Sequence, residues 1–139
     1  MKREESRVLV VDDCEGMRRA LSAIVSLLGF KVAQASNGLE AMALFLQQGF
    51  ELILTDLHMP GMDGWTLASA IKGRSPGTPV ILVTGSAPES VRTGSAQGCV
   101  DCVIFKPFRT EDVERAVLSL AGVKTEWTGQ EGRAAAAQA

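Results

Sequence analysis

Short apolar runs alternate along the chain with longer segments of helical period. The runs are rich in Val and Ile and mostly bounded by Gly, Pro or Asp, which predicts five strands, at 7–12, 31–35, 51–56, 79–84 and 101–105. Apolar residues at three- and four-residue spacing predict helices around 17–28, 39–45, 65–71, a more polar 88–97 and 113–120. The pattern therefore predicts a strand–helix unit repeated five times.

The apolar pattern of the strands indicates how they pack. The first, third and fourth predicted strands are apolar at nearly every residue rather than at alternate residues, as expected for strands that helices cover on both faces. The sequence therefore predicts an α/β fold, with a doubly wound (βα)5 parallel sheet and right-handed crossovers.

Several polar and glycine residues predict where helices begin and end. Ser36 to Gly38 provide a cap for the second helix, Gly29 closes the first in a left-handed conformation, and Thr110 caps the last. Apolar periodicity ends near Gly122. We therefore expect one domain over residues 1–122, followed by a poorly ordered C-terminal tail over residues 123–139.

Composition and charge exclude several classes of protein. The 139 residues, 46% of them hydrophobic, suit one domain with a single core. Fourteen Lys and Arg against 16 Asp and Glu provide no broad cationic surface, so nucleic acid is not expected as a direct partner. No apolar run approaches the roughly 18 to 20 residues that cross a bilayer, and the first residues lack a signal-peptide pattern. We expect a cytoplasmic protein that does not insert into membranes.

Three cysteines, Cys14, Cys99 and Cys102, indicate a reducing compartment rather than a disulfide framework. Cys99 and Cys102 form a C-x-x-C pair, but no second pair of ligands is available to complete a zinc site. The pair also precedes an apolar run instead of opening a helix, unlike a redox dithiol. We interpret both as small buried thiols.

Chemistry-bearing residues stand where the predicted strands end. Asp12 and Asp13 end the first strand, Asp56 ends the third, Thr84 ends the fourth, and Lys106 follows the fifth. The carboxyl ends of parallel strands form one edge, where ligands of such sheets bind. Three carboxylates brought together there repel one another, and Mg²⁺ is the natural counter-charge because it prefers oxygen ligands. The sequence therefore predicts a magnesium site.

The hydroxyl and the ammonium group complete a site for phosphoryl chemistry. Thr84 and Lys106 would receive the phosphoryl oxygens that the metal does not hold. A carboxylate can itself be the nucleophile, which makes Asp56 the candidate acceptor. Each residue alone is more often a turn, a cap or a solvated side chain, so the prediction depends on their combination at four strand ends.

Four motifs match a known family. The chain resembles, over about residues 6–121, the receiver domain of bacterial two-component response regulators, through "VLVVDD", "LILTDLHMPGMDG", "VILVTG" and "FKPF". The resemblance implies a flavodoxin-like sheet with strand order 2-1-3-4-5. It also implies that a histidine kinase or a phosphotransfer protein phosphorylates Asp56, and that the change is passed to an unknown downstream protein.

The resemblance also assigns ligands. It implies that Asp13 binds Mg²⁺ directly beside Asp56, that Asp12 binds through water, and that the backbone carbonyl of His58 completes the set. The His58 side chain, with Ser86 as its companion, is expected at the mouth of the site, where it influences dephosphorylation. Thr84 and Lys106 would contact the phosphoryl oxygens, with a cis peptide bond from Lys106 to Pro107.

Two residues depart from the family pattern. Val103 stands where receivers commonly have the Tyr or Phe that moves on phosphorylation. We therefore expect the signal to travel through the loop at 85–90, where Gly85 lowers the cost of movement. Gly98 lies eight residues before Lys106, one more than is common, which predicts a rearranged loop before the fifth strand.

Two other functions remain open from the sequence. A Mg²⁺-dependent aspartyl-phosphate phosphatase also uses an acid nucleophile at a strand end, but places a second acid two residues later, where this chain has His58. A receiver acting only as a structural module is the third possibility. The tail is too short for a helix-turn-helix, so no DNA-binding output is expected in it.

Overall fold

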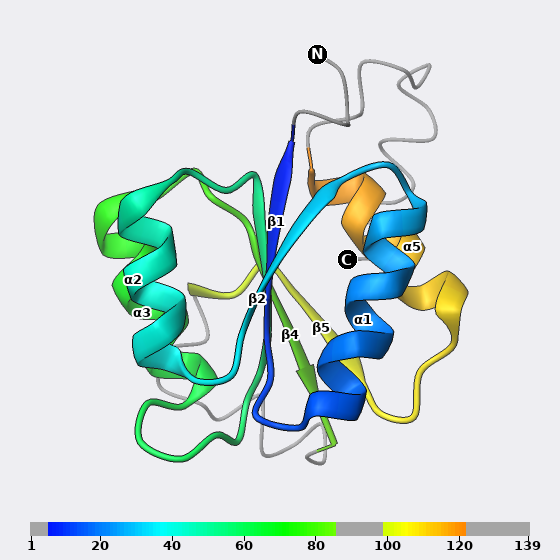
Figure 1. Cartoon of the computed structure of the whole chain (residues 1–139), viewed down its shortest axis with the longest axis horizontal. Helices are drawn as coiled ribbons and strands as arrows, with labels where there is room; N and C mark the ends of the chain where they lie inside the picture. Colours follow the sequence, from blue (N-terminus) through cyan, green and yellow to red (C-terminus); the bar gives the residue numbers. More distant parts are fainter. Residues whose placement is uncertain (1–5, 86–98, 122–139) are drawn as a thin grey trace.

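The computed structural model describes residues 6–85 and 99–121. The predicted helix at 88–97, Ser86, Gly98, most of the predicted signalling loop and the predicted tail at 123–139 lie outside these residues. Within them, a central sheet is covered by helices on both faces (Figure 1). The doubly wound α/β prediction is confirmed for this part of the chain.

All five predicted strands are present, and four are one residue shorter than predicted. They are β1 (Arg7–Val11), β2 (Lys31–Ala35), β3 (Leu52–Asp56), β4 (Val80–Thr84) and β5 (Cys102–Phe105). All pairs are parallel and the order is 2-1-3-4-5, as the resemblance implied. Because β1, β3 and β4 run parallel, the residues that end them share one edge.

The helices are α1 (Glu15–Leu27), α2 (Gly38–Gln47), α3 (Gly64–Arg74) and α5 (Thr110–Leu120). Helices α1 and α5 lie on one face of the sheet, and α2 and α3 lie on the other (Figure 1). Alternate residues of the interior strands enter opposite cores. Val8, Val10, Leu52 and Leu54 pack toward α1 and α5, whereas Leu9, Val11 and Ile53 pack toward α2 and α3. This explains why those strands are apolar at nearly every position.

Local hydrogen bonds set the helix ends, and one cap prediction is wrong. Asn37 caps α2, its Oδ1 accepting from the Glu40 N–H at 2.8 Å, and Gly29 closes α1 with φ of 103°, both as predicted. Thr110, however, is the first residue of α5 and not its cap. The cap is Arg109, whose N–H donates to the Asp112 carboxylate at 2.9 Å, because the acid lies three residues after Arg109.

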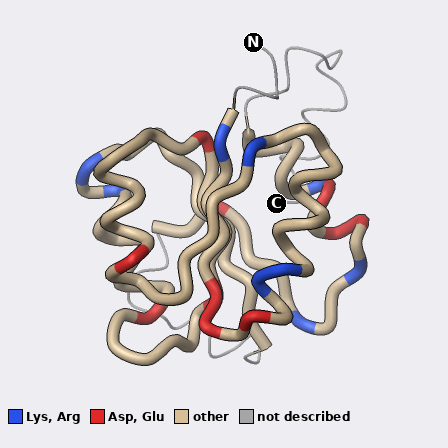
Figure 2. Tube along the Cα trace, in the orientation of Figure 1, with Lys and Arg blue, Asp and Glu red and all other residues tan. Residues whose placement is uncertain are grey.

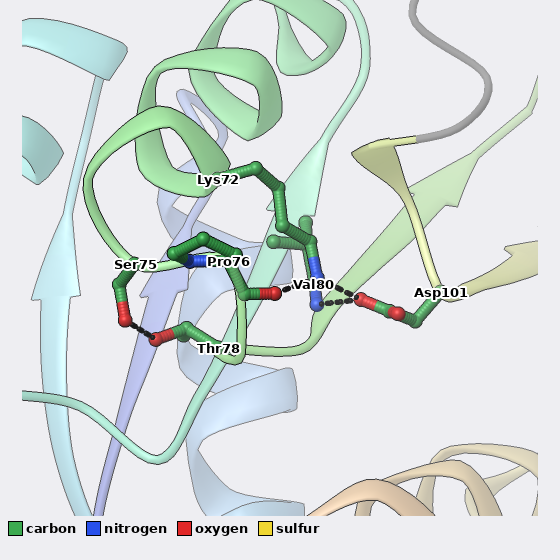
Figure 3. Close-up of polar contacts among 6 residues, drawn as sticks. All are labelled: Lys72, Ser75, Pro76, Thr78, Val80 and Asp101. Atoms are coloured by element: carbon green, nitrogen blue, oxygen red, sulfur yellow. Dashed lines mark hydrogen bonds and ion pairs between the residues drawn. The ribbon is translucent and has the colours of Figure 1, made fainter.

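A polar cluster closes the amino edge of the sheet, where β4 and β5 begin (Figure 3). The Lys72 ammonium lies 2.8 Å from Asp101 Oδ2, and the Val80 N–H donates to the same oxygen at 2.8 Å. The Asp101 N–H donates in turn to the Val80 carbonyl at 2.9 Å. We call Lys72, Val80 and Asp101 the amino-edge cluster. It fixes the start of β5 to both β4 and α3.

Cys99 and Cys102 are half-buried free thiols that pack against opposite cores. Burial, and secondarily the Asp101 carboxylate, raises the pKa of the Cys102 thiol. Both residues therefore pack as small apolar side chains, although neither is fully buried. Among the helices of residues 6–85 and 99–121, none is long and apolar enough to cross a membrane.

Candidate functional site

The structure brings the three predicted carboxylates together at the carboxyl edge of the sheet. Val11 on β1 pairs with Thr55 on β3. The next residues, Asp12 and Asp56, therefore lie at the ends of neighbouring strands. One carboxylate oxygen from each of Asp12, Asp13 and Asp56 lies within 4.8 Å of the others. Asp12 and Asp56 are buried and Asp13 is exposed. Two acids fixed in the sheet thus face a third that is open to solvent.

Asp12 has the least favourable surroundings of the three. Its Oδ1 accepts from the Cys14 N–H at 2.9 Å, whereas its Oδ2 is buried and has no hydrogen-bond partner within residues 6–85 and 99–121. Burial raises the pKa of this carboxyl above its ordinary value. The Cys14 N–H opposes that rise, and the Asp56 carboxylate adds to it. A buried anionic oxygen without a donor is stabilised when a cation binds it.

Lys106 approaches the acids from the other side of the site. Its ammonium lies 3.4 Å from Asp56 Oδ1, which is a long contact for a charged pair. Lys106 lies two residues after Ile104, which packs toward α1 and α5, and Asp56 lies two residues after Leu54 on that same face. The register of the sheet therefore brings the predicted lysine to the predicted acceptor.

Thr84 is held beside Lys106 through the backbone. It is fully buried at the end of β4, and its carbonyl accepts from the Lys106 N–H at 2.8 Å. The peptide bond from Lys106 to Pro107 is cis, as the resemblance implied. The hydroxyl-bearing and ammonium-bearing residues thus end adjacent strands, next to the three carboxylates.

Sequence reasoning missed one residue, Arg18, and one close contact, that of Gly64 with Asp56. Arg18 on α1 donates from Nη1 to the Asp12 carbonyl at 2.9 Å and from Nε to Gln34 Oε1 at 3.1 Å, fixing the end of β1 to β2. A Cβ at Gly64 would overlap the Asp56 carbonyl oxygen. The helical spacing that defined α1 carried no signal for Arg18, because its contacts depend on the fold.

The remaining predicted residues lie around the site. His58 is exposed two residues after Asp56. Val103 is half-buried and packs with Leu57 and Leu82 on the face opposite to Ile104, as strand alternation predicts. The β-branched side chain therefore occupies an apolar contact in place of the aromatic ring that the family commonly has there.

The donor set fits a hard divalent cation. One oxygen from each of three carboxylates lies within 4.8 Å of the other two, and Asp12 Oδ2 has no donor in the part of the chain that the structure describes. Mg²⁺ takes such oxygens and keeps several waters, which the exposed Asp13 side permits. The same edge can also hold a phosphoryl group between the cation and Lys106.

Comparison with known proteins identifies the family. The family profile described as the response regulator receiver domain matches residues 8–118. The transcriptional regulatory protein ResD of Bacillus subtilis is 35% identical over 116 residues, covering 84% of this chain and 48% of ResD. SrrA of Staphylococcus aureus is 33% identical over 115 residues, covering 83% of this chain and 47% of SrrA. The chain thus spans about half the length of the curated relatives it matches.

Solved receiver structures agree with this assignment. The response regulator TrrA of Thermotoga maritima, solved in complex with Mg(2+)-BeF, superposes with a TM-score of 0.77 at 28% identity, covering 83% of this chain and 98% of that one. Chemotaxis protein CheY4 of Vibrio cholerae gives 0.75 at 30% identity, with the same coverage. The chain belongs to the response regulator receiver domain family of two-component signal transduction.

Proposed function

We propose that Asp56 is the phosphoacceptor of this receiver. A carboxylate oxygen of Asp56 attacks the phosphorus of a phosphodonor, the bond to the donor's leaving group breaks, and an acyl phosphate forms on Asp56. The observation that supports this is the position of Asp56, between the Lys106 ammonium at 3.4 Å and the carboxylates of Asp12 and Asp13.

Each neighbouring residue has a role in positioning charge. The Lys106 ammonium and the Thr84 hydroxyl donate hydrogen bonds to phosphoryl oxygens, and the backbone hydrogen bond between the two residues keeps them side by side. Asp12, Asp13, Asp56 and the backbone carbonyl of His58 would hold Mg²⁺, directly or through water. The cation, when bound, neutralises the carboxylates and the incoming phosphoryl oxygens. The exposed His58 side chain would modulate the later loss of the phosphoryl group.

We propose the partners from the chain's membership of the receiver domain family. The donor is a sensor histidine kinase or a phosphotransfer protein, and the product acts on a downstream protein rather than on nucleic acid or a membrane, within the cytoplasm. ResD and SrrA are named as transcriptional regulators, and this chain matches about half of each.

We propose residues 1–122 as the receiver domain and 123–139 as a tail. The phosphatase alternative has less support, because His58 stands where that class has its second acid.

The test is labelling by a small phosphodonor. We expect acetyl phosphate with Mg²⁺ to add one base-labile phosphoryl group, measured by intact mass, and Asp56→Asn to abolish the addition. Asp63→Asn is the matched control, because Asp63 caps α3 through the Thr66 N–H and asparagine preserves such a cap. Label retained in Asp56→Asn, or lost in Asp63→Asn, would contradict the assignment.

A further inference from the structure

The backbone of the exposed acid, Asp13, is held on both sides of its Cα. The Asp12 carbonyl belongs to the peptide group before that Cα, and it accepts from Arg18 Nη1 at 2.9 Å. The Cys14 N–H belongs to the peptide group after it, and donates to Asp12 Oδ1 at 2.9 Å. Because peptide groups are planar, fixing the two that flank a Cα fixes the direction of its Cβ. These hydrogen bonds therefore orient an acid that burial does not hold.

Arg18 is itself fixed to two neighbouring elements. Its backbone N–H donates to the Cys14 carbonyl at 2.9 Å, which places it in the first turn of α1. Its Nε donates to Gln34 Oε1 on β2 at 3.1 Å, and the side chain is half-buried. A guanidinium group is planar, so the contact with Gln34 also sets the direction in which Nη1 meets the Asp12 carbonyl. The donor that holds the end of β1 is therefore held in place by α1 and β2.

The positive charge of Arg18 would by itself disfavour a second cation nearby. Figure 2 shows the acidic segment at the end of β1 beside the basic segment early in α1. Like charges repel, so an arginine that acted only through its charge would weaken Mg²⁺ binding. The two hydrogen bonds of the Arg18 side chain, however, end on uncharged acceptors, a backbone carbonyl and an amide oxygen. They hold the backbone of the acids and leave the carboxylates available to a metal.

We propose that Arg18 is a positioning residue for the magnesium site. It acts through the Asp12 carbonyl, and so through the peptide group that carries Asp13, without contact with the cation. Its removal lets the exposed acid reorient and weakens Mg²⁺ binding, although loss of the positive charge alone would strengthen it. Groups that orient metal ligands commonly contribute tenfold or more to affinity. The proposal rests on the metal site of the proposed function, but not on phosphoryl transfer to Asp56.

The test is a titration of the unphosphorylated chain with Mg²⁺, followed by the amide shifts of residues 12–14 and without any phosphodonor. Arg18→Met keeps much of the aliphatic stem and removes the donors, and should raise the dissociation constant for Mg²⁺ by about tenfold. Arg19→Met is the matched control, because it removes the same charge from the next residue of α1, where Arg19 pairs with the exposed Glu15 at 2.8 Å. This control should bind Mg²⁺ within about twofold of the parent, or slightly more tightly.

Two further variants separate positioning from charge and from folding. Arg18→Lys keeps the charge and one donor for the Asp12 carbonyl but loses the planar contact with Gln34, so it should restore part of the lost affinity. Gln34→Leu should weaken Mg²⁺ binding less than Arg18→Met does. Combined with Arg18→Met it should cause no further loss, because Gln34 acts only through Arg18. Circular dichroism melting checks that each variant folds.

Labelling by acetyl phosphate gives a second measurement. Arg18→Met should need about tenfold more Mg²⁺ for half-maximal labelling, as expected if the metal site is what changes. Its rate at saturating Mg²⁺ should stay within about twofold of that of the parent.

Four results would overturn the proposal: unchanged or tighter Mg²⁺ binding in Arg18→Met, equal weakening in Arg19→Met, a lower saturated rate with an unchanged Mg²⁺ requirement, or absence of Mg²⁺ binding in the parent. A parent that binds Mg²⁺ in the Arg18-dependent way but accepts no phosphoryl group would support this proposal and contradict the assignment of Asp56 alone.

Discussion

The two edges of the sheet each hold a lysine–aspartate pair, and the pairs differ in how completely they are satisfied. At the amino edge, Lys72 lies 2.8 Å from Asp101, and the same carboxylate oxygen accepts from the Val80 N–H. At the carboxyl edge, Lys106 lies 3.4 Å from Asp56, beside a buried Asp12 oxygen that has no donor among the described residues. The same residue types are closely paired at one edge and loosely paired at the other.

This difference separates a structural role at the amino edge from the functional role proposed for the carboxyl edge. Buried polar groups in folded proteins are normally hydrogen-bonded, and the N–H of the buried Val80 in the amino-edge cluster obeys that rule. Like charges gathered without full compensation cost stability, and such arrangements concentrate at functional sites. The carboxyl edge therefore retains unsatisfied charge that a cation and a phosphoryl group can compensate. Three experiments test whether the two edges differ in this way.

Removing each lysine should give the largest contrast. Lys106→Met is expected to slow phosphorylation by acetyl phosphate by roughly a hundredfold, because it removes a cation aimed at developing negative charge. Lys72→Met should leave that rate within about twofold, because Lys72 lies at the opposite edge. The rate is measured by intact mass over time at fixed Mg²⁺. Equal slowing in both variants would remove the distinction between the edges.

Changing Asp101 should measure what the amino-edge cluster contributes to stability. Asp101→Ala removes the acceptor for the Val80 N–H and the partner of Lys72, and should lower the free energy of unfolding by about 1 to 3 kcal/mol. Asp101→Asn keeps an acceptor and loses only a partly exposed ion pair, so its cost should be about 1 kcal/mol or less. Urea unfolding checks both values. If the asparagine variant were as unstable as the alanine variant, the ion pair rather than the hydrogen bond would hold this edge.

Changing Asp12 should raise the free energy of unfolding rather than lower it. Its pKa is raised by burial and by the neighbouring Asp56, so between the ordinary pKa and the raised pKa the unfolded chain has already lost a proton that the folded chain retains. Stability without metal therefore falls as pH rises through that interval, and Asp12→Asn should remove the fall.

The expected gain for Asp12→Asn at neutral pH without metal is on the order of 1 kcal/mol, since like charges about 4 Å apart repel by that much even in water. The gain should vanish at low pH, and added Mg²⁺ should stabilise the parent more than the variant. Chemical denaturation over a pH series measures all three effects. A variant less stable than the metal-free parent at neutral pH would show that Asp12 is satisfied after all.

Periodicity and strand-end chemistry predicted much of this molecule, for identifiable reasons. Strands buried on both faces show their burial directly as apolar runs, so β1, β3 and β4 were recognisable. The convergence of Asp12, Asp56 and Lys106 followed from parallel strands alone. Strand order came only from family resemblance, because periodicity does not specify which strands are neighbours.

The failures were at single contacts. Thr110 has the favoured chemistry of a cap, yet Arg109 became the cap because the Asp112 carboxylate was positioned to accept from its N–H. Arg18 gave no sequence signal because its acceptors, the Asp12 carbonyl and Gln34, are 6 and 16 residues away. Such contacts exist only after the chain has folded. The expected effect of Val103 on signalling stays a prediction.

The pairing of β3 has a consequence for folding fidelity. Residues Leu52–Leu54 are apolar toward both cores, so a slip of one residue between β1 and β4 exchanges one aliphatic side chain for another at modest cost. The slip is costly at the end of the strand, because it draws the Asp56 carboxylate between two apolar strands and away from Lys106. The phosphoacceptor candidate therefore also marks the correct alignment of the sheet. A deletion within β3 would therefore both displace Asp56 from the site and shift the pairing of the strand.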